Sequence, residues 1–130
     1  MFAELPVLHV PRVLAVVPER VWTDAEWERI SAGVRSTMME ERWNLYADGD
    51  VVVLHRSWTG FRIFELTFSP VPGGGRRITS AVVEGDGVHY RARGDEHERL
   101  MVEIVLDSVV FEVRRRDLSA VYDALPFDYS

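Results

Sequence analysis

Residues 43–57, WNLYADGDVVVLHRS, decide the fold that we expect for this chain. Apolar and polar residues alternate over the first five positions, which is the period of a half-buried β-strand. The Asp48-Gly49 pair follows as a two-residue hairpin signal, because both central positions of a type I′ turn need positive φ. Residues 51–57 then run back as the partner strand. Valine occurs on both sides of that strand, which favours a central position with both faces covered.

Two further strands are expected over residues 61–69 and 77–84, separated by a loop rich in proline and glycine. Short connections make consecutive strands antiparallel neighbours, so the four strands should form a meander. One more short strand is expected over residues 12–17. Pro11 and Pro18 bound it and would confine it to an edge of the sheet.

The first helix is expected over residues 24–39. Thr23 and Glu26 have the spacing of a capping box, which satisfies two N–H groups at the start of a helix. Apolar residues at helical spacing follow, and Gly33 weakens the helix by up to ~1 kcal/mol relative to alanine.

A second helix is expected to start at Asp95, where Glu98 completes another capping-box pattern. His97 falls in its first turn and is expected to be exposed. A short last helix should run from Asp117 to Ala124. The expected buried face of the second helix consists of Leu100, Met101, Ile104, Ser108 and Phe111.

The predicted fold is therefore α+β, a four-stranded antiparallel meander with two longer helices packed on one face. The chain has 130 residues, which fits one domain spanning residues 1–130.

Composition narrows the class of protein. The apolar fraction is 47% and no apolar run approaches the roughly 18–20 residues of a membrane span, so no membrane contact is expected. Residues 1–6 do not resemble a secretory signal, and cysteine is absent, so the expected location is the cytoplasm. The net charge is −6, which argues against nucleic acid as a partner, since such binding relies on neutralising phosphates.

The basic residues are 15 arginines without a lysine. Schiff-base chemistry and a Walker-type phosphate loop are excluded, because both need a lysine side chain. Anions must be bound by guanidinium groups, histidine or backbone N–H groups. The run of arginines at residues 114–116 is expected to be a solvated helix end.

Polar and aromatic residues crowd together at residues 55–60, HRSWTG. The guanidinium of Arg56, nearby hydroxyls and the N–H groups of the turn could converge on an anion. Trp58 or Trp43 could supply a flat wall for a base or ring. The sequence therefore predicts a binding module for an anionic or nucleotide-like small ligand. The predicted site consists of Arg42, Trp43, His55, Arg56, Ser57, Trp58 and Thr59, with Tyr46 and Arg62 as weaker additions.

A purely structural interpretation of the same stretch stays open. Arg56 would pair with Glu41 or Glu65, His55 would donate to a backbone carbonyl, and Trp58 would pack into the core. Buried polar groups without partners cost about 1–3 kcal/mol each, so some partner must exist in either case.

Part of the chain resembles a group of small uncharacterised bacterial proteins. The resemblance covers roughly residues 38–68 and depends on an R/K-W-x-x-Y stretch at Arg42 to Tyr46 and on the H-R-S-W-T-G box. It implies no particular chemistry. The loop at residues 70–75 and the tail after Phe111 depart from the pattern.

Two other functions remain as alternatives. The chain could be a protein-interaction partner, such as an antitoxin- or immunity-like protein, because its acidic surface could steer it towards a basic partner. It could also be an enzyme that uses His55 as acid or base, although no Gly-x-Ser-x-Gly elbow accompanies Ser57. No cofactor and no metal site are expected, because His89 and His97 lack a metal-binding spacing.

Overall fold

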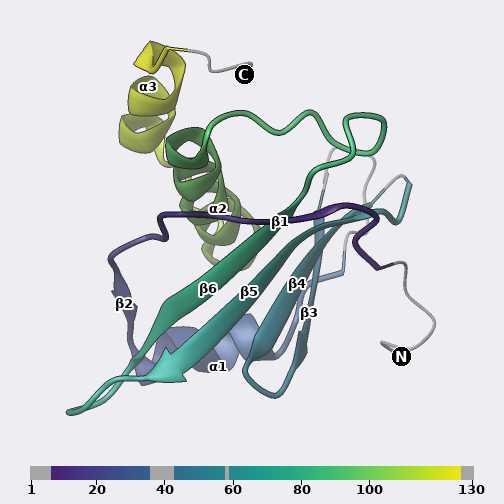
Figure 1. Cartoon of the computed structure of the whole chain (residues 1–130). Coiled ribbons are helices and arrows are strands. Elements are labelled where there is room, and N and C mark those ends of the chain that lie inside the picture. The colour runs from purple at the N-terminus through teal and green to yellow at the C-terminus, as the bar shows by residue number, and fades with distance from the viewer. Residues whose placement is uncertain (1–6, 36–42, 58, 127–130) are drawn as a thin grey trace.

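The computed structural model describes residues 7–35, 43–57 and 59–126. These residues form three helices and six strands (Figure 1). The helices are α1 (Asp24–Ser31), α2 (Asp95–Phe111) and α3 (Arg116–Ala124); the strands are β1 (Pro11–Val13), β2 (Val21–Trp22), β3 (Trp43–Asp48), β4 (Val51–Arg56), β5 (Arg62–Pro70) and β6 (Arg76–Glu84).

The α+β class and the antiparallel meander are confirmed, but the sheet has six strands and not four. The order is β1-β6-β5-β4-β3, and β2 also pairs with β6. The four long strands lie where they were expected, within one residue at each end. The count of four left out the short strand expected over residues 12–17, which is β1 in the structure, and it missed β2, whose two residues are too few to show a hydrophobic period.

The expected strand over residues 12–17 is shorter than predicted. Leu14 still donates its N–H to the carbonyl of Ala81 in β6, at 2.9 Å. The next N–H, that of Ala15, donates to the carboxylate of Asp95 at the start of α2, at 2.9 Å. The hydrogen bonds between this segment and β6 therefore end at Leu14. The chain pairs with β6 again only at β2, where Val21 pairs with Arg77.

The β3–β4 hairpin is confirmed in its register, with Leu45 opposite Leu54. Its two-residue turn is Gly49-Asp50, one position later than expected. Gly49 has a φ of 60°, whereas Asp50 is not among the residues with positive φ. The turn is therefore not the type I′ turn that the sequence suggested.

Helix α1 ends well before residue 39. Its capping box is confirmed: Glu26 and Thr23 bond each other's backbone N–H groups. Gly33 then adopts a φ of +80°, and Val34 exchanges two backbone hydrogen bonds with Leu45 of β3. The N–H and C=O groups of Val34 are used in this bridge, so they cannot make the hydrogen bonds of a longer helix.

Helix α2 starts at Asp95 as predicted, but its cap and its buried face differ. Gly94 is the N-cap, and it makes no side-chain cap bond. Glu98 turns inward and accepts from the backbone N–H of Arg93. Ser108 is exposed. His97, expected in solvent, is 2% exposed, with its ring edge-on to Tyr122 of α3.

The core lies between the sheet and the two helices α1 and α2, which occupy the same side of the sheet in Figure 1. Ile30 of α1 and Leu106 of α2 are both fully buried in one cluster with Phe64 and Leu66 of β5. Helix α3 lies beyond α2, on the side away from α1. Among the described helices, none combines the length and the apolar character that crossing a bilayer requires.

Candidate functional site

The predicted site falls at one end of the sheet, where β4 passes into β5. We call residues 55–61 the corner. Arg42 and Trp58 lie outside the described residues, so the structure places five members of the predicted site. These are Trp43, His55, Arg56, Ser57 and Thr59.

Arg56 is the centre of the corner. It pairs across the sheet with Trp43 of β3, and its guanidinium carbon lies 4.3 Å from the centroid of the Trp43 ring. The ring of Tyr90 is 5.7 Å away. Stacking on aromatic faces holds a guanidinium in place while its N–H groups, which lie in its plane, keep their geometry for acceptors. Trp43 is only 9% exposed, so it supports Arg56 and does not present an open ring.

The turn that follows is tied together by its own backbone. Gly60, with a φ of +74°, donates its N–H to the carbonyl of Arg56 at 2.8 Å. Phe61 donates its N–H to the hydroxyl of Thr59 at 3.2 Å. Two N–H groups expected to face an anion are thus used inside the turn. Ser57 is half-buried and Thr59 is exposed.

His55 faces away from this surface. Its side chain is 2% exposed, and its ring lies edge-on to that of Tyr46, with centroids 5.6 Å apart. Arg62, which pairs with His55 across the sheet, is bonded to Glu65 at 2.6 Å. Glu65 is therefore engaged by Arg62. Because His55 is enclosed, the geometry gives it little access to a substrate.

The loop after β6 completes this end of the molecule. Phe61 of the corner stacks on His89, with ring centroids 3.8 Å apart and planes at 13°. Tyr90 packs edge-on to Phe64 and donates its hydroxyl to Glu98 at 2.6 Å. Burial, followed by the nearby Glu98 charge, raises the pKa of Tyr90, so its hydroxyl stays protonated as a donor.

His9, from the N-terminal segment, contacts the same loop after β6. Its Nδ1 is 2.5 Å from the Asp86 carboxylate, and its ring stacks on that of His89 at 5.2 Å. A hydrogen bond from Val88, followed by that of His9, lowers the pKa of Asp86. The hydrogen bond with Asp86 in turn raises the pKa of His9.

Glu84 ends β6 beneath this group and is fully buried. It accepts backbone N–H bonds from His9 at 2.6 Å, Val10 at 2.7 Å and Asp86 at 3.2 Å. Burial alone would raise the pKa of Glu84, but these three bonds together outweigh it and lower the pKa. One ionised carboxylate thus holds two distant segments together.

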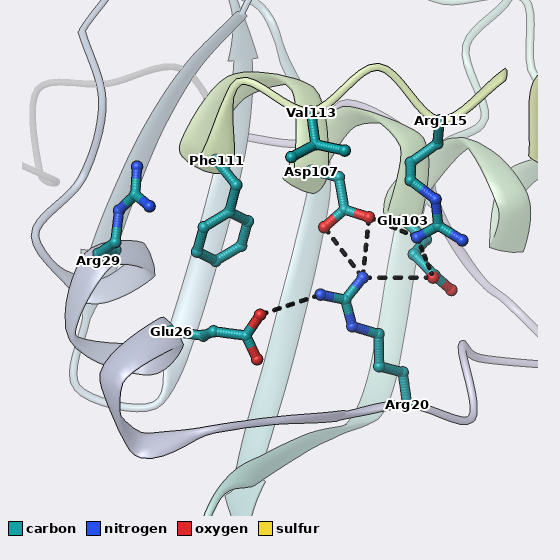
Figure 2. Close-up of a pocket in the computed structure, with 8 residues that line it drawn as sticks. All are labelled: Arg20, Glu26, Arg29, Glu103, Asp107, Phe111, Val113 and Arg115. Atoms are coloured by element: carbon teal, nitrogen blue, oxygen red, sulfur yellow. Dashed lines mark hydrogen bonds and ion pairs between the residues drawn. The ribbon is translucent and has the colours of Figure 1, made fainter.

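A second polar region lies between the N-terminal segment and α2 (Figure 2). Asp107, 3% exposed, accepts from Arg20 at 2.8 and 3.0 Å and from Arg115 at 2.7 Å. Glu103 and Glu26 flank the two guanidinium groups. The arginine run at residues 114–116 was expected to be solvated, but Arg115 folds back onto α2. The two positive and three negative charges of this region pair with one another, so we assign it a structural role.

We expect the Asp117 carboxyl to titrate near pH 2 in a carbon-detected NMR titration. Arg115 donates to both of its oxygens, at 3.0 and 2.8 Å, which lowers the pKa from 3.8 to about 2. The ionised Asp117 carboxylate therefore contributes fully to stability above its pKa in the unfolded state. This contribution is lost as the pH falls through its pKa in the folded state. In Arg115→Gln the midpoint should return towards 3.8; an unchanged midpoint would contradict the assignment.

Comparisons with protein-family models, with curated proteins and with solved structures give no match for this chain. Sequence reasoning missed His9, Asp86, His89 and Tyr90, which the fold brings to the corner. The one local signal was the Gly85-Asp86-Gly87 turn, which indicated only the end of a strand.

Proposed function

We propose that this chain is a small binding module that recognises an anionic or nucleotide-like ligand at the corner. The observation that carries the proposal is the placement of Arg56, stacked on Trp43 and beside Tyr90. A guanidinium fixed in this way can offer two parallel N–H bonds to a carboxylate or phosphate. An arginine has five N–H donors in all, so it can bind a ligand while keeping a protein partner.

The hydroxyls of Ser57 and Thr59 lie next along the chain and supply further donors. Trp43 supports Arg56, and the contribution of Trp58 and Arg42 stays a prediction. His55 is enclosed, so the proposal gives it no direct contact with a ligand.

The test is thermal unfolding of the chain with inorganic phosphate, AMP and ATP, since a ligand that binds only the folded state raises the unfolding temperature. We expect at least one of these anions to raise it, and Arg56→Gln to abolish that rise. A larger rise with AMP than with phosphate would show that the nucleoside part, base and ribose together, contributes.

Arg77→Gln is the matched control. Arg77 is an exposed arginine on β6, at the opposite end of the sheet, and its loss should leave the ligand effect unchanged. The proposal fails if no anion stabilises the wild type, or if Arg56→Gln retains the full effect.

A further inference from the structure

We propose that His9, Asp86 and His89 bind a divalent transition-metal ion of the Zn²⁺ type beside the corner. Each residue offers one ligand atom, and the three atoms all lie within 4.8 Å of one another. The site goes beyond the proposed ligand function, because it uses different residues and is tested without any anion.

The spacing needs only a small adjustment to hold an ion. Zinc binds histidine nitrogen and carboxylate oxygen at about 2.0–2.2 Å, so ligand atoms around a tetrahedral ion lie roughly 3.3 Å apart. The ion would replace the present 2.5 Å contact between His9 Nδ1 and the Asp86 carboxylate. The side chain of His9 is 66% exposed, so its ring can shift by this amount.

The ligand types indicate the class of ion. Two imidazoles and one carboxylate suit Zn²⁺ and neighbouring transition metals, whereas Mg²⁺ and Ca²⁺ prefer oxygen ligands. Three protein ligands leave the fourth tetrahedral position to water or to an anion. The ion would add positive charge near the corner, because His89 stacks directly on Phe61.

Buried support distinguishes this cluster from an ordinary surface pair. Glu84 accepts the backbone N–H groups of His9 and Asp86, so the two ligand backbones are fixed to one carboxylate. The same carboxylate lies 3.6 Å from Nδ1 of His89. Carboxylates behind a metal-binding histidine orient its ring and increase its basicity as a ligand. A simple His–Asp surface pair would need neither the second imidazole nor this support.

The experiment is isothermal titration calorimetry with ZnCl₂ on the full chain, purified without a histidine tag and freed of metal by chelation. We expect one Zn²⁺ per chain, with MgCl₂ giving no binding. His9→Gln and His89→Gln should each weaken Zn²⁺ binding more than about tenfold, on the scale of losses at metal sites. In NMR spectra, the rings of His9 and His89 should shift with Zn²⁺ while those of His55 and His97 stay unchanged.

Asp48→Asn is the matched control, since it removes an exposed carboxylate at the other end of the sheet. It should leave Zn²⁺ affinity unchanged. The metal-free thermal midpoint of each variant shows that it is folded. Equal Zn²⁺ affinity in the wild type and in the His9→Gln/His89→Gln double variant would overturn the proposal. Zinc binding without any effect of phosphate or AMP would leave the metal site standing and reject only the anion function.

Discussion

Replacing Asp107 with asparagine should lower the free energy of unfolding by about 3 kcal/mol, the lower end of the range for breaking a buried ion pair. Asp107 is 3% exposed and accepts from both Arg20 and Arg115. An amide offers one acceptor oxygen, and its NH₂ group would face a guanidinium. The value lies at the low end because the two arginine side chains are 26% and 25% exposed, so water can solvate them in part.

Urea unfolding followed by circular dichroism measures this loss. Glu96→Gln is the matched control, because Glu96 pairs with Arg99 on the same helix, outside this network, and its side chain is 54% exposed. It should leave the unfolding midpoint near that of the wild type, since exposed pairs contribute little. If the two variants lose the same stability, the network of Figure 2 does not anchor the N-terminal segment to α2.

Phe68→Ala should have the largest effect, about 3–5 kcal/mol, the usual cost of truncating a buried phenylalanine. Phe68 is 1% exposed on β5. Its ring lies 5.4 Å from that of Trp22 and 4.9 Å from that of Trp27. Truncation would remove both aromatic contacts and leave a cavity beneath α1, which its neighbours could fill only in part.

The same urea experiment with Phe68→Leu separates volume from ring contacts. Leucine fills most of the space, so this variant should lose less than half as much stability as Phe68→Ala. Equal losses would show that the aromatic contacts and not the cavity dominate. A loss below about 1 kcal/mol for Phe68→Ala would contradict the described core packing.

Local patterns predicted the parts of the fold that local chemistry controls. The β3–β4 hairpin follows from alternation around a glycine turn, and α1 starts at a capping box that depends on four adjacent residues. The end of α1 could not be predicted in this way. It depends on Val34 pairing with Leu45, and no local pattern in the sequence indicates that these two positions pair.

The side chains of helix α2 show the same limit to what local sequence patterns can predict. Its start was predicted, but Glu98 bonds Tyr90 and Arg93 outside the helix, and His97 is covered by α3. Both residues look like ordinary exposed members of a first turn. Their burial depends on the elements that pack over them.

The corner could be predicted only in part, for a related reason. Trp43 and Arg56 meet because hairpin register places them opposite each other. Tyr90 and His89 reach the corner only because β6 lies beside β5 and the next loop folds back. His9 and Asp86 are separated by 77 positions and meet because β1 pairs with β6. Neither contact has a sequence spacing that could indicate it.

The pairing of both β1 and β2 with β6 has a consequence for how the chain acquires its shape during synthesis. Residues 11–22 emerge from the ribosome early, yet their hydrogen-bonding partners lie at residues 76–84. The early segment must therefore wait, unpaired, until more than fifty later residues have been made. Contacts of such long range close late and slowly, because loop-closure entropy opposes them until the rest of the sheet exists. The hairpin of β3 and β4 needs no such delay and can template the sheet from its β3 edge towards β6.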